Sequence, residues 1–272
     1  MTLSSLSEKM TISEKMTMIA PAKQTTDDAT LIASIPREFP IASQTSIYDK
    51  TVLLKTRDIF HSWPGYNYLE VGSFLGGSIA PFCADDHCKH ILSIDDRGRN
   101  QPDERGLKAD YTAITSQMML DNLTRNNLPV EKVETFDGSI TDYLSRERSY
   151  ELMMVDGEHT NWACFRDFIH GQKLLTRNAI VMFHDTSLIF VSLKIIRENL
   201  LAMGVDFLYF KERRSDISFI LLNDYAHVGF ENLFDRESDL LAYEQLVEHS
   251  LARHFVRNKT RLPKLLVKLL LR

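Results

Sequence analysis

The sequence predicts a doubly wound α/β fold, in which a mostly parallel sheet of seven strands is covered by helices on both faces. Short apolar stretches alternate with longer stretches of helical spacing, which is the pattern of βαβ units. The last two apolar stretches are separated only by "KERRSD". So short a connection suits an antiparallel hairpin and cannot hold a crossover helix. We therefore expect parallel strands followed by an antiparallel last strand.

Each element can be placed from its pattern. The expected strands are residues 66–71, 90–95, 132–136, 151–155, 179–183, 206–210 and 217–222. The expected helices between them are residues 111–126, 162–175 and 188–203. The carboxyl ends of parallel strands meet at one edge of the sheet, so residues that follow them are candidates for a binding site.

The chain divides into three parts. Residues 1–45 are rich in Ser, Thr, Lys and Glu and contain the tandem repeat "LSEKMT"/"ISEKMT", so we expect a disordered N-terminal tail. A short lid helix that orders over a site is the alternative. Residues 46–235 form the α/β domain. Residues 236–272 are expected to form a C-terminal helix with a basic tail.

Composition limits the classes of function. Hydrophobic residues make up 44% of the 272 residues and charged residues 25%, as in ordinary globular proteins. The net charge of -5 disfavours a nucleic-acid partner, which would need a basic face. Three cysteines form no paired framework, and neither a signal peptide nor a transmembrane run is recognisable. We therefore expect a cytoplasmic protein without a transmembrane segment.

The C-terminal end has a different charge from the rest of the chain. Residues 251–272 contain seven Lys or Arg and no Asp or Glu. A solvated basic helix packed through its leucines is the favoured interpretation. A weak contact with anionic lipid or a partner protein is the alternative.

The loop after the first expected strand has the character of a ligand site. Glu70 stands at the strand end, and Gly72, Ser73, Gly76 and Ser78 follow. Glycines there allow a sharp turn and a close approach of a ligand to the backbone. The dinucleotide spacing G-x-G-x-x-G is absent, and Glu70 disfavours a pyrophosphate. An acidic residue suits a ligand with an amino group or a positive charge.

Acidic residues also end the next two strands. Asp95 ends the second strand, where a carboxylate can accept hydrogen bonds from ribose hydroxyls. Asp137, Gly138 and Ser139 follow the third strand at the same edge.

Together with "VDGEH" at 155–159, this ordered series resembles the class I S-adenosylmethionine (SAM)-dependent methyltransferases, in particular the small-molecule and sugar O-methyltransferases. The resemblance spans roughly residues 65–222 and implies a Rossmann-like fold with strand order 3-2-1-4-5-7-6. It implies SAM as cofactor, with the methionine portion on the glycine loop, the ribose on Asp95 and the adenine beside Asp137 and Ser139. The residues that it assigns to the methionine portion are Glu70, Gly72, Ser73 and Ser78.

The implied strand order brings two further strand ends together. Asp156 and His159 follow the fourth strand, and His184 and Asp185 follow the fifth. The resemblance implies that Asp156 and Asp185 share a divalent cation, Mg²⁺ being the candidate. His184 departs from the acidic pair of those relatives, and imidazole is a poor magnesium ligand. His159 is our first choice for the catalytic base, with His184 next, while Asp156 orients a histidine, contacts the cofactor amine or binds the metal.

Other interpretations stay open. A non-catalytic cofactor-binding protein would have the same fold, whereas an NAD-type oxidoreductase is disfavoured by the spacing around Gly72. A capped turn explains a single Asp or His at a strand end about as well as chemistry does, but not two such ends side by side. A zinc site made of Cys83, His87, Cys88 and His90 is disfavoured by its spacing.

The acceptor is expected to be a small molecule with a hydroxyl group, a sugar being favoured. Residues 97–110 are a candidate wall of its pocket, where Arg97, Arg99 and Arg105 would meet a carboxylate or phosphate unless they are simply solvated. The oligomeric state is not indicated.

Overall fold

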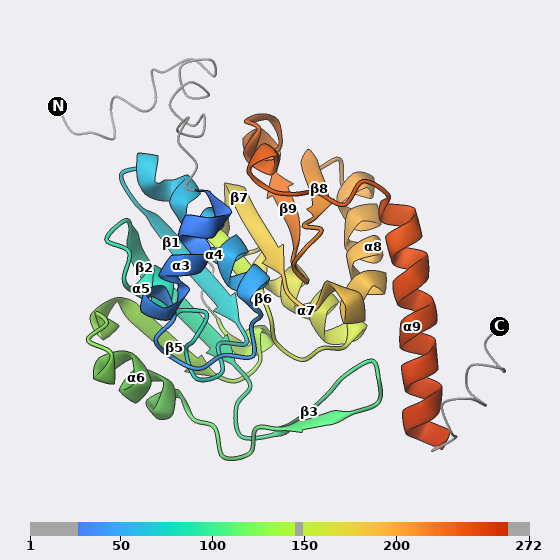
Figure 1. Cartoon of the computed structure of the whole chain (residues 1–272), viewed down its shortest axis with the longest axis horizontal. Helices are drawn as coiled ribbons and strands as arrows, with labels where there is room; N and C mark the ends of the chain where they lie inside the picture. Colours follow the sequence, from blue (N-terminus) through green and yellow to red (C-terminus); the bar gives the residue numbers. More distant parts are fainter. Residues whose placement is uncertain (1–26, 145–148, 261–272) are drawn as a thin grey trace.

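The protein is built around one large sheet, shown in Figure 1. The computed structural model describes residues 27–144 and 149–260, and within them the sheet has seven strands in the order β5-β2-β1-β6-β7-β9-β8. The strands are β1 Tyr66–Val71, β2 Cys88–Asp95, β5 Val133–Asp137, β6 Tyr150–Val155, β7 Leu175–Phe183, β8 Phe207–Lys211 and β9 Ser218–Leu222. Only β9 runs antiparallel to its sheet neighbours. The predicted fold and strand order are confirmed.

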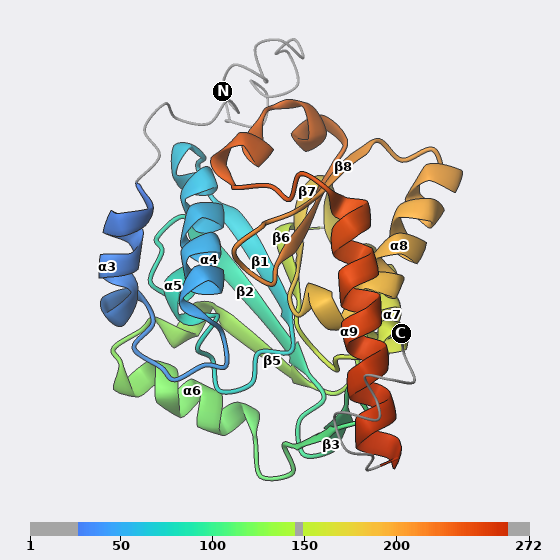
Figure 2. The same ribbon diagram turned by 45° about the vertical axis from the view of Figure 1, so that its right-hand side comes forward.

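Helices cover both faces of this sheet (Figures 1 and 2). The α-helices are α3 Asp28–Glu38, α4 Ile47–Ile59, α5 Ala80–Cys83, α6 Ser116–Arg125, α7 Asn161–Gly171, α8 Thr186–Ala202 and α9 Leu240–Thr260. Short 3-10 helices include η1 Phe60–Ser62 and η3 Ile140–Asp142. The hairpin β3 Asn100–Pro102 and β4 Lys108–Asp110 occupies the segment that we expected to form a pocket wall.

Strand β6 shows why its sequence is a continuous apolar run. Leu152 and Met154 pack in the hydrophobic cluster beneath α3, α4 and α5. Met153 and Val155 point to the opposite face and pack with residues of α7 and α8. Because successive side chains alternate between two covered faces, positions 152 to 155 must all be apolar.

The N-terminal segment contradicts our prediction of a tail up to residue 45. Helix α3 is capped by Asp27, whose side chain accepts a hydrogen bond from the backbone N–H of Thr30. Leu31 and Ile35 on one face of the helix are buried, as are Phe39 and Ile41 after it. The apolar spacing was present in the sequence but was outweighed by the polar composition. Residues 1–26, with the tandem repeat, lie outside the described residues.

Helix α9 lies against α8, as Figure 2 shows. An ion pair of 2.6 Å joins Arg197 Nη2 to Glu244 Oε1, and Val247 is buried. Residues 261–272 lie outside the described part, so the proposed lipid or partner contact of the basic end stays a prediction. Within the described ranges, no helix has the length and apolarity needed to span a bilayer.

Candidate active site

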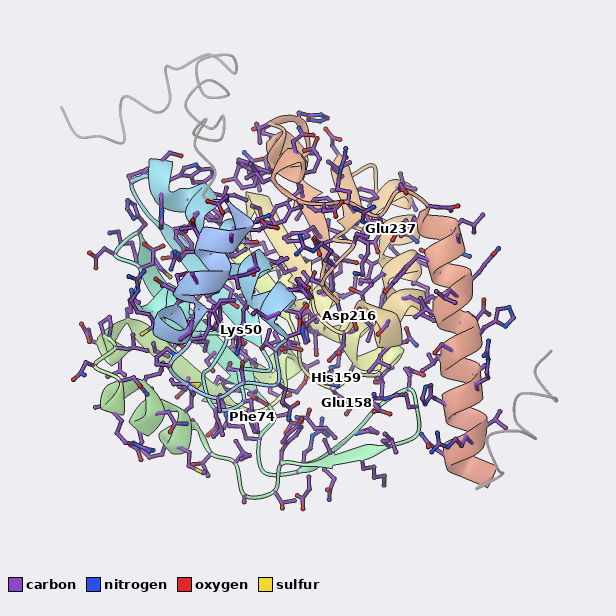
Figure 3. All side chains as sticks on the ribbon, viewed as in Figure 1. Lys50, Phe74, Glu158, His159, Asp216 and Glu237 are labelled. Atoms are coloured by element: carbon purple, nitrogen blue, oxygen red, sulfur yellow. The ribbon has the colours of Figure 1, made fainter. Side chains whose placement is uncertain are left out.

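A cavity of ≈ 270 Å³ lies at the carboxyl ends of the parallel strands. Figure 3 places Phe74 and His159, which both line it, at this end of the sheet. Other lining residues are Ser43, Gln44, Thr45, Gly72, Ser73, Gly77, Ser78, Asp95, Arg97, Gln101, Asp103, Arg105, Tyr111, Asp156, His184 and Asp185. The loops that follow β1, β2, β6 and β7 therefore share one concave site, as expected for an open α/β sheet.

Four residues of this cavity form what we call the carboxyl-end cluster: Asp156, His159, His184 and Asp185. His184 Nδ1 lies 2.9 Å from Asp156 Oδ1 and 3.4 Å from Asp185 Oδ2. His159 Nε2 lies 3.0 Å from Asp185 Oδ2 and 3.7 Å from Asp156 Oδ1. The cluster thus interleaves two imidazoles with two carboxylates, and it brings together every residue predicted as catalytic or metal-binding.

The local backbone keeps these side chains out of helix capping. Helix α7 is capped by Thr160, whose hydroxyl accepts the N–H of Ala163. Asp185 precedes α8 in the left-handed region, with φ 52°, and its side chain caps no backbone N–H. A non-glycine residue in that conformation is uncommon and occurs where a site constrains the chain. The carboxylate of Asp185 is therefore directed to the histidines.

Asp49 is a member of this network that the sequence did not reveal. Its Oδ2 lies 3.5 Å from His184 Nε2 and accepts the N–H of Ser46, while its Oδ1 accepts the N–H of Asp216. Ser46 and Asp49 form the capping box of α4, but nothing in the sequence indicated that α4 brings Asp49 to His184. His184 is consequently enclosed between carboxylates on both ring nitrogens.

The surrounding carboxylates control the charge of both imidazoles. Burial disfavours the charged form of His184, but Asp156, Asp185 and Asp49 outweigh it and raise its pKa well above the usual value. Burial opposes the charge of His159 as well, yet Asp156 and Asp185 raise its pKa to about 10. The pKa of Asp185 is lowered despite its burial, because both histidines stabilise its negative charge. Both histidines therefore favour the protonated form more strongly than a free imidazole does.

The glycine loop contacts this cluster through the backbone. Gly72 has φ +96°, and a Cβ atom on it would lie 2.1 Å from the carbonyl oxygen of Asp156. Only glycine allows the two loops to cross so closely. Ser73 also lines the cavity, and its hydroxyl lies 2.6 Å from that of Ser93.

Glu70 and Gly76 do not reach the cavity, although both were predicted to bind the cofactor. Glu70 is fully buried and accepts hydrogen bonds from Tyr68 and from Ser78, which does line the cavity. Burial raises the pKa of Glu70 to about 8, against the lowering effect of these two hydroxyl donors. Gly76 lies under α6, where an added Cβ would meet Met119. Both residues support the loop from behind.

The predicted ribose and adenine residues occupy different positions. Asp95 lines the cavity and accepts the N–H of Phe74 at 2.8 Å. Asp137 does not line it, because its carboxylate accepts hydrogen bonds from Arg97 (2.7 Å) and Ser116 (2.6 Å). Ser139 lines a smaller neighbouring cavity of ≈ 20 Å³ that Asp95 also borders.

Two segments form the outer wall of the cavity. Residues 43–45 line it, and Tyr111 donates a hydrogen bond to Gln44 Oε1 at 3.3 Å. Across from them is the β3–β4 hairpin, where Arg105 is paired with Asp103 at 2.6 Å. Asn258 of α9 holds this hairpin by donating a hydrogen bond of 2.7 Å to the carbonyl oxygen of Arg105. Residues 43–45 were missed because they lie in the stretch that was assigned to a tail.

The disfavoured zinc site of two cysteines and two histidines is not formed. Cys83 Sγ lies 3.1 Å from the carbonyl oxygen of Pro129, and Cys88 Sγ lies 3.7 Å from that of His90. Among the described residues, neither cysteine belongs to a group of converging metal donors.

The fold and the site define an α/β protein with a ligand cavity at the carboxyl ends of its strands, and comparison identifies its class. Residues 69–186 match the family model described as a methyltransferase domain. The matched segment, within the Rossmann-like fold described above, indicates a SAM-dependent methyltransferase.

Solved structures that are similar to the chain include three methyltransferases, of which NovP reaches a TM-score of 0.50. The O-methyltransferase NovP shares 13% identity over 78% of this chain and 99% of that chain, with a TM-score of 0.50. The O-methyltransferase TomG from Streptomyces achromogenes shares 14% identity over 74% of this chain and 91% of that chain, with a TM-score of 0.45. MycE, a methyltransferase from the mycinamycin biosynthetic pathway, shares 12% identity over 72% of this chain and 56% of that chain, with a TM-score of 0.49. No curated protein sequence matches the chain.

Proposed function

We propose that the protein transfers the methyl group of SAM to a hydroxyl oxygen of a small polar molecule. The observation that carries this proposal is the meeting of Gly72, Asp156 and Asp185, from the ends of β1, β6 and β7, around one cavity. A donor on the glycine loop and an acceptor beside the carboxyl-end cluster would share that cavity. Gly72, Ser73, Ser78, Asp95 and Asp156 are the residues that we assign to SAM.

The reaction is an in-line displacement at carbon. The acceptor oxygen forms a bond to the methyl carbon, and the bond from that carbon to sulfur breaks. Its electron pair leaves with sulfur, so the sulfonium becomes the neutral thioether of S-adenosylhomocysteine. The hydroxyl proton must go to a base, because a neutral alcohol is a weak nucleophile.

We assign the base to His159. It lines the cavity and its side chain is 26% exposed, whereas that of His184 is 9% exposed and enclosed by Asp156 and Asp49. With a pKa of about 10, His159 is protonated at neutral pH and cannot yet accept a proton. A sulfonium placed in the same cavity adds positive charge, which lowers the pKa of a neighbouring imidazolium. His159 thus becomes a base when SAM is bound, and His184 orients Asp156.

A divalent cation fits part of this cluster. Donor atoms of Asp156, His184 and Asp185 lie within 4.8 Å of one another. Carboxylate oxygens suit Mg²⁺, but the imidazole makes the set better matched to Mn²⁺, Fe²⁺ or Zn²⁺. A cation held there would lower the pKa of an acceptor hydroxyl. Removing metal with EDTA and restoring Mg²⁺, Mn²⁺ or Zn²⁺ singly tests this assignment through turnover.

The acceptor class follows from the outer wall. Gln44, Gln101, Asp103, Arg105 and Tyr111 supply donors and acceptors of hydrogen bonds to the cavity, beside the apolar Pro102, Ala109 and Ile114. Such a lining suits a molecule with several hydroxyl groups, such as a sugar, better than a flat apolar catechol. Arg97 also lines the cavity, but its side chain is only 3% exposed and its Nη1 is paired with Asp137.

Two measurements test the proposal in sequence. Calorimetric titration should show binding of S-adenosylhomocysteine and none of NAD. The formation of S-adenosylhomocysteine from SAM is then measured over a panel of sugars, catechols and carboxylic acids, for the wild type and for His159→Gln. Binding in both proteins, with turnover on hydroxyl acceptors in the wild type alone, is expected. Equal turnover in the variant would remove His159 as base, and binding without turnover on any acceptor would favour a non-catalytic binding protein.

A further inference from the structure

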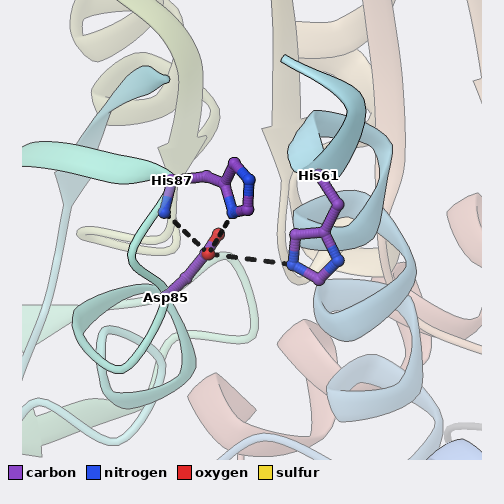
Figure 4. Close-up of side chains that lie close together, drawn as sticks. All are labelled: His61, Asp85 and His87. Carbon is purple, nitrogen blue, oxygen red and sulfur yellow. Dashed lines mark hydrogen bonds and ion pairs between the residues drawn. The ribbon is translucent and has the colours of Figure 1, made fainter. Parts of the chain in front are cut away.

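A second group of histidines and a carboxylate lies at the opposite edge of the sheet, and we call it the amino-end cluster: His61, Asp85 and His87. His61 belongs to η1, and Asp85 and His87 lie in the turn between α5 and β2 (Figure 4). The adjoining strand residues are the first of β1 and β2, Tyr66 and Cys88. None of the three members lines the active-site cavity.

The donor atoms of this cluster have the separations that a small metal ion requires. His87 Nδ1 lies 3.2 Å from Asp85 Oδ1, and His61 Nε2 lies 3.7 Å from the same oxygen. All three donor atoms lie within 4.8 Å of one another. In a tetrahedral zinc site with bonds of about 2.0–2.1 Å, ligand atoms are about 3.4 Å apart. Small side-chain rotations of the two exposed imidazoles would suffice to close the site.

The carboxylate at the centre is fixed and lacks a permanent cation. The Asp85 side chain is 4% exposed, and its Oδ2 accepts a hydrogen bond of 2.9 Å from the hydroxyl of Tyr66. Its Oδ1 accepts the backbone N–H of His87 at 3.0 Å and faces both imidazoles. Within the described ranges, no Lys or Arg forms an ion pair with this carboxylate, and Lys132 Nζ instead donates a hydrogen bond of 2.7 Å to the backbone carbonyl of Asp85. A buried carboxylate without a cationic partner is costly, and a bound cation would remove that cost.

His61 has no hydrogen bond that explains its position. Its Nε2 is 3.6 Å from Asp58 Oδ1 and 3.7 Å from Asp85 Oδ1, which is beyond hydrogen-bonding distance in both cases. Its ring nevertheless faces the same oxygen as the ring of His87, with 5.2 Å between the ring centroids. The turn that contains Asp85 and His87 does not need His61 for its own structure. The approach of the His61 imidazole from η1 is therefore unexplained by the turn alone.

We propose that the amino-end cluster binds Zn²⁺ through His61, Asp85 and His87, with water completing the coordination. Two imidazole nitrogens and one carboxylate oxygen suit Zn²⁺ and exclude Mg²⁺ as the preferred ion. The Tyr66 hydroxyl orients the carboxylate, as a second ligand shell does in known zinc sites. The ion would connect the end of α4 and η1 to the turn before β2, and so would stabilise the fold without taking part in the reaction.

The test compares zinc binding by full-length variants that differ only at histidines. Zinc stoichiometry is measured by equilibrium dialysis, and melting temperature with and without zinc, for wild type, His61→Gln, His87→Gln and His249→Gln. His249 is an exposed histidine of α9 outside both clusters, so it controls for non-specific imidazole binding. Asp185→Asn is added because the carboxyl-end cluster also presents converging donors.

Zinc at about 100 times its dissociation constant should raise the melting temperature of wild type, His249→Gln and Asp185→Asn by roughly 5–10 °C. His61→Gln and His87→Gln should lose the part of this shift that Asp185→Asn retains, and their amino-end cluster should bind zinc at least about 10-fold more weakly. Their SAM turnover should be unchanged, which separates this site from the proposed reaction. Equal zinc binding by His61→Gln and His249→Gln would overturn the proposal. So would a result in which Asp185→Asn is the one variant that binds less zinc than wild type.

Discussion

The two edges of the sheet carry groups made of the same residue types, but the groups behave differently. The carboxyl-end cluster interleaves two imidazoles with two carboxylates at 2.9–3.0 Å, and its histidine side chains are 26% and 9% exposed. The amino-end cluster has two imidazoles for one carboxylate, at 3.2 and 3.7 Å, and its histidine side chains are 40% and 44% exposed. The carboxyl-end imidazoles are thus more buried and contact more carboxylates, which raise their pKa values, while the amino-end imidazoles are more exposed and share a single carboxylate.

The largest expected effect comes from removing a charge at the carboxyl end. Asp185→Asn should lower kcat by about 10²- to 10⁴-fold, because it removes the carboxylate that both imidazoles contact. Asparagine tolerates the left-handed conformation of this position, so the fold should persist. Turnover and the affinity for S-adenosylhomocysteine are measured together. Unchanged turnover of Asp185→Asn would show that the carboxyl-end cluster has no more part in catalysis than the amino-end cluster.

The next effect tests the backbone on which the carboxyl-end cluster rests. Gly72→Ala should lower the free energy of unfolding by at least about 3 kcal/mol, because a Cβ atom would overlap the carbonyl of Asp156. Gly98→Ala is the matched control, since Gly98 also has positive φ but no atom within 4 Å of the added Cβ. It should cost about 1–2 kcal/mol. Equal losses of unfolding free energy in Gly72→Ala and Gly98→Ala would mean that the close contact between Gly72 and the Asp156 carbonyl does not contribute to stability.

The pH dependence of stability separates the clusters further. The folded-state pKa of His159 is about 10 and its ordinary value is 6.5, so its stabilising contribution is complete below pH 6.5 and disappears as pH rises through 10. Wild type should lose up to about 1.4 kcal/mol per pH unit in this range relative to His159→Gln. Urea unfolding between pH 6 and pH 10 measures the difference. A difference in unfolding free energy between wild type and His159→Gln that does not change with pH would contradict the raised pKa of His159 in the folded protein.

A smaller pH effect on stability is expected at Glu70. Its buried carboxylate accepts hydrogen bonds from the hydroxyls of Tyr68 and Ser78 and has no imidazole partner. Its folded-state pKa is about 8 and its ordinary value is 4.5, so the cost of ionising it increases from pH 4.5 to pH 8. Glu70→Gln should therefore gain stability relative to wild type over that range, while cofactor affinity changes by less than about 3-fold, since Glu70 does not line the cavity. A large loss of affinity on titration would show that Glu70 acts on the ligand directly.

The smallest effect is expected at the amino end in the absence of zinc. His61→Gln replaces an exposed imidazole that makes no hydrogen bond to Asp85, so unfolding free energy should change by less than about 0.5 kcal/mol. Denaturant unfolding in EDTA measures this. A larger loss would assign His61 a packing role in place of a ligand role.

The sequence predicted those parts of the site that follow directly from strand ends. Asp156 and Asp185 meet because they end neighbouring parallel strands, β6 and β7. Glu70, which we predicted to bind the cofactor, does not line the cavity, since it lies two residues after Tyr68 and so points to the same buried face. Asp49 was missed because its contact with His184 depends on how α4 packs over the sheet, and no local pattern encodes that packing. His61 escaped notice for the same reason, being remote in sequence from Asp85.

The hydrogen bond from Asn258 to the Arg105 carbonyl gives the last described helix a connection to the mouth of the cavity. Residues more than 150 positions apart thus share control over how the outer wall is positioned. Substitutions along α9 could therefore retune which acceptors are admitted while the chemistry at the strand ends stays intact. Evolution would then have a route to new substrates that never touches the catalytic groups.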